Sequence, residues 1–524
     1  MFLKLLDLDY NDEIYEKIYL KHDDYVKNQR NIMDIIKEIK YYSLYFVDYY
    51  NISKIIKPFN DIICLNSKLL EELKLTKING ENSSSFINLI KDLNNLKSLT
   101  IESIPDNESF FDDISKVIKE NTLKKLEMNL YYFEGGINII KKNSFSLNEL
   151  TLKINHKKNN KVKILKTLYN LVNLRKLRII TKFPIINAND IKYLSFKELK
   201  YLEIPLYIKK GFFDFNSFFE NIPNIKTIKF YGIQFDNINE KEDKNNHFFK
   251  EFNINLKNIL LLRKIKFYNC KQNSSFFILQ FLQFLSKVKI KDNITEIKIE
   301  NCEFDKNVGI NDIFRVISLF SELRNLHINN TIFQKGENFY YDKMNNLKKL
   351  EKFYFKGLDN QQNNLHLLSF ISHLSEQCKN LINIGLSCKQ LNSDDINLIL
   401  RKLIDFQFLT KVNLFDNYSK VDYYSNRDRN YNGLIDLESI KNFYMIDLRN
   451  IKISKNFIHK KINSYFYPKI TIKDYFHENK NQNFSNKIED YYSYQNLFSE
   501  NSKIKIMHYS NSQKIFIISE ILSS

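Results

Sequence analysis

Apolar and polar residues alternate in one short pattern, apolar-x-x-apolar-x-apolar, which occurs fourteen times along the chain. With the first apolar residue counted as position 1, the repeats begin at Leu70, Leu96, Leu123, Leu147, Leu174, Leu199, Ile225, Leu262, Ile294, Leu323, Leu350, Leu381, Leu409 and Ile440. Thirteen intervals between residues 70 and 440 cover 370 residues, so the mean period is about 28. A segment with apolar residues at alternate positions is typical of a strand with one buried and one solvated face.

The intervening positions show that the pattern is not a by-product of a hydrophobic composition. Positions 2, 3 and 5 of the fourteen repeats hold 42 residues, and only Tyr201, Tyr354, Ile382 and Tyr444 among them are apolar or aromatic. A chain that is 43% hydrophobic would place about eighteen such residues there by chance. The pattern therefore predicts repeated strands.

Segments with helical spacing of apolar residues lie between the predicted strands. They are residues 86–93, 110–118, 162–171, 310–319, 367–374 and 396–403. In the fourth of them, steps of one, three and four residues place Ile313, Phe314, Ile317 and Phe320 on one helical stripe. Alternation of strand and helix predicts an α/β solenoid in which a curved parallel sheet lies inside and helices lie outside.

The pattern resembles the ribonuclease-inhibitor-like group of leucine-rich repeats, with long repeats, over residues 70–450. In that group position 9 is commonly Asn or Cys and points inward, and here it is Cys270 in one repeat and Cys302 in the next. Other repeats carry an aliphatic residue at this position, namely Ile78, Ile104, Ile233 and Leu358. The resemblance implies a leucine-rich-repeat solenoid with a degenerate inner turn.

The ends of the chain depart from the regular array. Residues 1–65 lack the repeat and have helical spacing at Ile14 and Ile18 and again between residues 32 and 39, which predicts a helical N-terminal cap. Residues 66–450 form the predicted array of about 14 repeats, and residues 451–524 form a partly irregular C-terminal cap with one last strand near Ile470 and Ile472.

Composition narrows the class of protein. The N-terminal segment carries acidic residues where a leader would be apolar, and no apolar stretch approaches the roughly 20 residues that span a bilayer, so we expect a cytoplasmic location, with a nuclear one left open. The five cysteines form no CxxC pair, which favours reduced structural thiols, and we expect no metal and no cofactor. No phosphate-binding glycine loop is present, so we expect no enzyme.

Basic residues gather in the middle of the array. At positions 2, 3 and 5 of the six repeats from Leu174 to Leu323 the sequence has eleven cations, Arg175, Lys176, Arg178, Lys200, Lys226, Lys229, Arg263, Lys264, Lys266, Lys298 and Arg324, against Glu203 and Glu296. Eleven minus two gives +9 over eighteen positions. Lysine supplies 69 of the 79 basic residues, so the total net charge of +18 also fits an AT-rich codon bias.

Aromatic residues accompany these cations and complete the predicted partner site. The site comprises Arg175, Lys176, Arg178, Tyr201, Lys226, Lys229, Tyr231, Arg263, Lys264, Lys266, Tyr268, Lys298, Arg324, His327 and Tyr354. We interpret His327 as a surface histidine in a row of hydrogen-bonding residues. Such a wall is suited to an acidic surface that also offers groups for tyrosine contacts.

The predicted function is a non-catalytic scaffold that binds an acidic protein partner on the concave sheet surface. A nucleic-acid-binding protein is one alternative, because the pI is about 9.2 and lysines alternate with tyrosines. A ubiquitin-ligase substrate receptor is another, because residues 9–18 are faintly similar to the start of an F-box.

Overall fold

The structure is a computed structural model of the 524-residue chain. The described residues are 17–21, 43–47, 70–76, 83–102, 108–130, 134–154, 167–181, 186–187, 195–208, 215–235, 261–271, 274–335, 346–357, 364–388, 393–416, 445–450, 469–474, 505–508 and 517–520. The chain forms two compact units, Met1–Leu262 and Arg263–Ser524, and each is described by itself.

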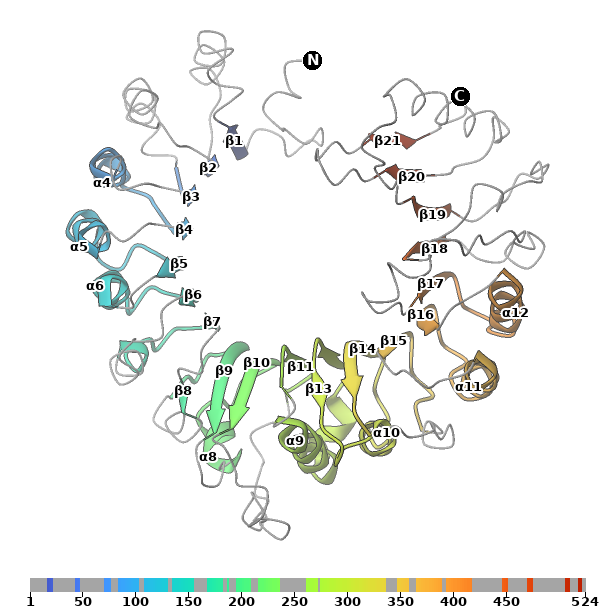
Figure 1. The fold of residues 1–524 in the computed structure, drawn as a ribbon. Helices are drawn as coiled ribbons and strands as arrows, with labels where there is room; N and C mark the ends of the chain where they lie inside the picture. The colour runs from blue at the N-terminus through green and yellow to red at the C-terminus, as the bar shows by residue number, and fades with distance from the viewer. Residues whose placement is uncertain are drawn as a thin grey trace. The chain divides into compact units, whose positions relative to one another are not determined.

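The N-terminal unit alternates strands with helices. Its elements are β1 (Lys17–Lys21), β2 (Ser43–Val47), β3 (Glu72–Thr76), α4 (Ser83–Asp92), β4 (Ser98–Glu102), α5 (Glu108–Val117), β5 (Lys125–Leu130), α6 (Glu134–Lys142), β6 (Glu149–Ile154), β7 (Lys176–Thr181), β8 (Ile186–Asn187), β9 (Tyr201–Ile208), α8 (Phe215–Glu220) and β10 (Thr227–Phe235). Within this unit, helices α4, α5 and α6 lie on one side of the strands (Figure 1).

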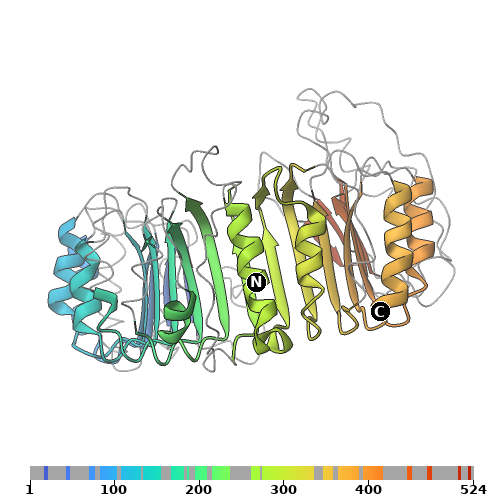
Figure 2. The same cartoon turned by 90° about the horizontal axis from the view of Figure 1, so that it is seen from below.

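The C-terminal unit has the same organisation. Its elements are β11 (Lys264–Tyr268), α9 (Ser275–Lys287), the 3-10 helix η5 (Lys289–Asn293), β12 (Glu296–Glu300), β13 (Glu303–Phe304), α10 (Ile310–Ile317), β14 (Asn325–Phe333), β15 (Lys352–Gly357), α11 (Asn364–Gln377), β16 (Asn383–Cys388), α12 (Ser393–Leu403), β17 (Lys411–Asp416), β18 (Met445–Asn450), β19 (Lys469–Asp474), β20 (Lys505–His508) and β21 (Ile517–Glu520). Figure 2 shows α9 and α10, in yellow-green and yellow, running alongside the strands of this unit.

Strand pairing confirms the predicted repeat register. In the N-terminal unit position 3 of each repeat faces position 3 of the next, as in the parallel pairs Glu72↔Ser98, Lys125↔Glu149 and Lys176↔Tyr201. The C-terminal unit follows the same rule, with Lys264↔Glu296 and Asn383↔Lys411. The predicted fold class is therefore confirmed: each unit is part of an α/β leucine-rich-repeat solenoid with a parallel sheet backed by helices.

One predicted register is wrong. Lys411, at position 3 of its repeat, pairs with Met445, so the following repeat begins at Phe443 and not at Ile440. The sequence contains two overlapping matches there, because Ile440, Phe443 and Met445 fit the pattern as well as Phe443, Ile446 and Leu448. Only the pairing between strands distinguishes the two.

Parallel pairing continues on both sides of the predicted array. β1 pairs with β2 and β2 with β3, in register with position 3 at Lys17 and Ser43, so these segments are strands and the prediction of helix at Ile18 is wrong. The remainder of the predicted N-terminal cap lies outside the described residues. At the other end, β19 confirms the strand predicted near Ile470, but it is not the last, because β20 pairs with it and β21 pairs antiparallel with β20.

The predicted helices also agree with the structure where it describes them. Helices α4, α5, α10, α11 and α12 cover five of the six predicted segments, while most of the segment 162–171 lies outside the described residues. The core of each repeat consists of positions 1, 4 and 6, as in Leu174, Leu177 and Ile179, which are buried. Full burial of one such side chain contributes about 1.5–3 kcal/mol, so the aliphatic rows account for the rigidity of the sheet.

A residue in the left-handed region recurs at the same position of four successive repeats. Position 8 has a positive φ in each case, at Gly232 (61°), Asn269 (53°), Asn301 (53°) and Asn330 (50°). The next residue, at position 9, is buried in all four: Ile233, Cys270, Cys302 and Thr331. Thr331 donates its hydroxyl to the carbonyl oxygens of Ile299 (3.3 Å) and Asn329 (3.1 Å), so it takes the inward place held by the cysteines.

We expect Asn301→Val to destabilise the C-terminal unit by about 1–2 kcal/mol, because a β-branched residue is strained at a φ of 53°. Asn301→Gly is the matched control, since it relieves that strain while removing the same side-chain hydrogen bond, which Asn330 Nδ2 donates to Asn301 Oδ1 (3.1 Å). Denaturant unfolding of the two variants measures the difference. Equal losses in both variants would contradict the role of backbone conformation.

Candidate functional site

The fifteen residues of the predicted partner site fall into two groups, one in each unit. Arg175, Lys176, Arg178, Tyr201, Lys226, Lys229 and Tyr231 lie in the N-terminal unit, and Arg263, Lys264, Lys266, Tyr268, Lys298, Arg324, His327 and Tyr354 lie in the C-terminal unit. Positions 3, 5 and 7 of each repeat alternate along the strand with the buried positions 4 and 6. Their side chains therefore form the open face of the sheet, the face turned away from the helices.

A buried carboxylate organises the open face of the N-terminal unit. Glu203, at position 5 of β9, is only 1% exposed. Its register partners on the neighbouring strands are Arg178 and Lys229, which contact it through Nε (2.7 Å) and Nζ (2.9 Å). Tyr201 donates its hydroxyl to Glu203 Oε2 at 3.1 Å. Glu203, Arg178, Lys229 and Tyr201 thus form one fixed cluster, which we call the Glu203 cluster.

Ionisation within the Glu203 cluster follows from these contacts. Burial alone would raise the pKa of Glu203, but the hydrogen bonds from Arg178 and Lys229 outweigh burial and hold the pKa below its usual value. Burial, together with the adjacent Glu203 carboxylate, raises the pKa of Tyr201 to about 12. The carboxylate is therefore charged and the phenol neutral at neutral pH, so this tyrosine acts as a hydrogen-bond donor.

A second buried carboxylate holds three lysines in the C-terminal unit. Glu296, at position 3 of β12, is 7% exposed and lies 2.9 Å from Lys266, 3.1 Å from Lys264 and 3.6 Å from Lys298. Burial opposes its ionisation, but the hydrogen bonds from Lys266 and Lys264 lower the pKa of Glu296 to about 2. In this Glu296 cluster three ammonium groups share one carboxylate, so the cluster keeps a net positive charge.

Aromatic rings lie beside both clusters. His327 and Tyr354 occupy position 5 on paired strands and stack with their ring centroids 4.5 Å apart at an interplanar angle of 19°. Burial, and next the nearby Lys298, lowers the pKa of His327 to about 4, so the imidazole is neutral at neutral pH. In the N-terminal unit Lys229 Nζ lies 5.9 Å from the centroid of the Tyr231 ring. His327 is thus a half-buried residue stacked on Tyr354, and its place in a row of hydrogen-bonding residues stays a prediction.

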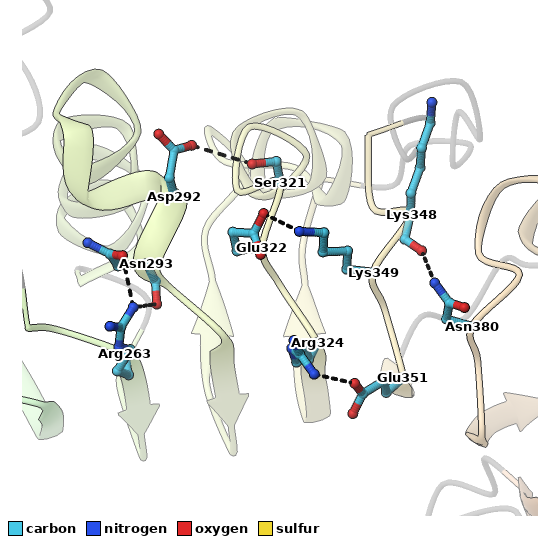
Figure 3. A network of polar contacts seen from close by, with 10 residues as sticks. All are labelled: Arg263, Asp292, Asn293, Ser321, Glu322, Arg324, Lys348, Lys349, Glu351 and Asn380. Atoms are coloured by element: carbon cyan, nitrogen blue, oxygen red, sulfur yellow. Dashed lines mark hydrogen bonds and ion pairs between the residues drawn. The ribbon is translucent and has the colours of Figure 1, made fainter.

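Three further predicted cations lie at or directly before the first residue of a strand, namely Lys176, Arg263 and Arg324. Lys176 pairs with Glu149 at 3.1 Å, and Arg324 pairs with Glu351 at 2.8 Å. Arg263 donates to the side-chain and backbone oxygens of Asn293, at 2.8 Å and 3.2 Å (Figure 3). Much of the counted charge of +9 is therefore met by carboxylates, two of which, Glu149 and Glu351, belong to repeats outside the six that were counted.

Sequence reasoning counted Glu203 and Glu296 only as charges to subtract. In the structure they are the residues around which the cations gather, and they bring together Arg178 with Lys229 and Lys264 with Lys266. The available signal was their position in the register, since each lies directly opposite a cation on the adjacent strand. A diagonal contact of the same charge type occurs earlier in the array, where Lys153 contacts Glu127 at 2.8 Å.

Within the described ranges, no set of three or more His, Cys, Asp or Glu side chains is arranged to hold a metal ion. The helices described there are all too short or too polar to cross a bilayer. Cys270, Cys302 and Cys378 are buried and form no disulfide, and burial raises the pKa of Cys378 to about 12, so these thiols are packing residues.

Comparison with known proteins gives a likeness to solved structures only. No protein-family model and no curated protein matches the chain. One similar structure is an internalin from Listeria monocytogenes, with a TM-score of 0.32 and 15% identity over 77% of this chain and 91% of the other. Another is TLR13 in its complex with ssRNA13, with a TM-score of 0.37 and 14% identity over 84% of this chain and 62% of that one. The fold assignment rests on strand pairing, and the ribonuclease-inhibitor-like subgroup stays a prediction.

Proposed function

We propose that this chain is a non-catalytic binding scaffold that captures an acidic macromolecular partner, most directly a protein, on the open face of its sheet. The observation that carries the proposal is the Glu296 cluster, in which three lysines converge on one buried carboxylate. Two positive charges remain there after pairing, and the stacked rings of His327 and Tyr354 lie beside them. Cations next to aromatic groups suit a partner surface that combines carboxylates with apolar groups.

The fixed geometry of the cluster supports binding over mere solvation. Lys264, Lys266 and Lys298 are held in place by Glu296, so ordering them against a partner costs less side-chain entropy than ordering free lysines. The open face is also built from paired strands, which gives each cation a fixed neighbour. A partner carboxylate that contacts this cluster meets charge that is already positioned.

Lysine-directed cross-linking tests the proposal. The chain is isolated with its bound partners from its own cells, treated with an amine-reactive cross-linker, and the linked peptides are identified by mass spectrometry. We expect links from Lys264, Lys266 or Lys298 to a partner protein. Links confined to lysines on the helix side, such as the exposed Lys287 on α9, would contradict binding on the open face.

A nucleic acid is the second candidate partner, because lysine and aromatic side chains alternate on the open face. The contact of Lys229 with Tyr231 and the stack of His327 on Tyr354 are the kind of features that bind bases and phosphates in single strands. The F-box alternative gains no such support. Residues 17–18, the end of the similar segment, lie in strand β1, whereas an F-box is a helical module.

A further inference from the structure

Position 2 of each repeat, the residue just before the strand, is cross-linked to a neighbouring repeat in some repeats and not in others. Lys97 pairs with Glu71 in the N-terminal unit, while Arg263 donates to Asn293 and Arg324 pairs with Glu351 in the C-terminal unit (Figure 3). In the N-terminal unit, Lys124, Arg175, Lys200 and Lys226 at position 2 are all exposed. Among the residues that the structure describes, these four form no ion pair and no side-chain hydrogen bond.

Backbone hydrogen bonds hold these four cations in one row along the sheet. The amide of Asn148 donates to the carbonyl oxygen of Lys124 (2.8 Å), and that of Arg175 donates to Asn148 (2.7 Å). Lys200 donates in turn to Arg175 (2.8 Å), and Lys226 to Lys200 (2.9 Å). Adjacent strands lie about 4.8 Å apart, so the row from Lys124 to Lys226 is about 19 Å long. We call the five residues Lys124, Asn148, Arg175, Lys200 and Lys226 the edge row.

The four cations of the edge row have no carboxylate partner among the described residues, unlike the cations on the adjoining open face. On the open face next to it, Arg178 and Lys229 are bound to Glu203, and Lys176 is bound to Glu149. A partner that approaches the open face must compete with those carboxylates. A partner that approaches the edge row meets guanidinium and ammonium groups without such competition, in a line whose spacing the backbone fixes.

Exposed apolar side chains lie just before the edge row in the sequence and in the fold. Phe145 is 66% exposed and Val172 is 50% exposed, and each precedes its edge-row residue, Asn148 or Arg175, by three positions. The two loops are neighbours, because Asn173 Nδ2 donates to the carbonyl oxygen of Phe145 at 2.7 Å. A row of cations beside exposed aromatic and aliphatic groups favours a chain that presents both carboxylates and apolar side chains.

We propose that the edge row of the N-terminal unit is a docking site for an extended acidic segment of a protein partner. An extended peptide advances about 3.3 Å per residue, so about six residues cover the row, with acidic side chains on one face opposite Lys124, Arg175, Lys200 and Lys226. Apolar residues of the same segment contact Phe145 and Val172. The inference rests on the proposed function in one respect only, namely that the partner is acidic.

The test measures fluorescence anisotropy of a labelled peptide of about twelve residues in which glutamate alternates with valine and serine. The edge variant is Arg175→Glu, Lys200→Glu and Lys226→Glu together. The control variant, Lys91→Glu, Lys119→Glu and Lys141→Glu, makes the same change of charge at exposed lysines of the N-terminal unit, on or next to its helices. A third variant, Lys264→Gln with Lys298→Gln, removes charge from the Glu296 cluster. All are made in the full chain, and circular dichroism checks their folding.

We expect the edge variant to bind the peptide at least about tenfold more weakly than the wild type, and the control variant to bind within about twofold. If the edge variant binds the peptide like the control while the third variant binds it more weakly, the edge row is excluded as the docking site and the proposed function stands. If the three variants all bind like the wild type, or the wild type does not bind, both proposals fail. If a labelled oligo-dT of equal charge bound more tightly than the peptide, the partner would be a nucleic acid and the proposed protein segment would be ruled out.

Discussion

Replacement of Glu296 by glutamine is expected to destabilise the C-terminal unit by on the order of 3 kcal/mol at neutral pH and to remove part of its acid sensitivity. The pKa of Glu296 falls from 4.5 to about 2 in the folded chain. At about 1.4 kcal/mol per pKa unit, this shift corresponds to the stated loss. The Glu296 side chain is 7% exposed, so little of the effect is screened by water.

The direction of the pH dependence follows from the sign of the shift. Because the folded pKa of Glu296 lies below the unfolded one, its contribution to stability is fully present above about pH 4.5 and is lost as the pH falls toward 2. The wild type should therefore lose stability in this window, and Glu296→Gln should lose less. Denaturant unfolding at neutral pH and near pH 3 measures both.

Glu300→Gln is the matched control, since Glu300 lies on the same strand at position 7 and has no such cluster of lysines around it among the described residues. We expect it to change stability by at most about 0.5 kcal/mol. Unchanged stability of Glu296→Gln at neutral pH would contradict the role of Glu296 as the anchor of the three lysines.

The repeat register was predictable because burial selects it. Positions 1, 4 and 6 must be apolar in every repeat, as in Leu174, Leu177 and Ile179, and a shift by one residue would bury charged side chains instead. The register failed only where a second set of apolar residues overlapped the first, at Ile440 and Phe443.

The extension of the sheet toward the N-terminus was missed for a different physical reason. The pairing places Lys17 and Ser43 at position 3, which puts Tyr15 and Tyr41 at position 1. An aromatic residue in that place does not match an aliphatic pattern. The spacing of Ile14 and Ile18 also fits a helix, and a four-residue step alone does not exclude a strand.

The position of the cations could be predicted, but their neutralisation could not. A sum of charges over selected repeats treats each side chain as independent, whereas Arg178 and Lys229 both contact the one carboxylate of Glu203. Which charges meet depends on the parallel register and on side-chain length, and both are properties of neighbouring strands. The unpaired cations of the described part of the N-terminal unit include those of the edge row, among them Lys124 and Lys200, two residues absent from the predicted site.

Asn143→Ala is expected to cost about 3 kcal/mol of stability in the N-terminal unit. Asn143 follows α6 and is fully buried. Its Oδ1 accepts hydrogen bonds from the amides of Thr122 (3.1 Å) and Leu123 (3.0 Å), which lead into β5, and its Nδ2 donates to the carbonyl oxygen of Ile139 (3.1 Å). Alanine leaves these groups without a partner in a region from which water is excluded, and each such loss costs about 1–3 kcal/mol.

The matched control is Asn138→Ala in α6, because Asn138 is exposed and its side chain forms one hydrogen bond among the described residues, to Asp112 Oδ1 at 3.2 Å. Water replaces that bond, so we expect a loss of at most about 0.5 kcal/mol. Amide hydrogen exchange adds a local measurement: the amide of Leu123 should lose protection in Asn143→Ala and keep it in the control. Equal unfolding midpoints for the two variants, with Leu123 still protected in both, would show that another group satisfies these amides and that Asn143 does not join α6 to the start of β5.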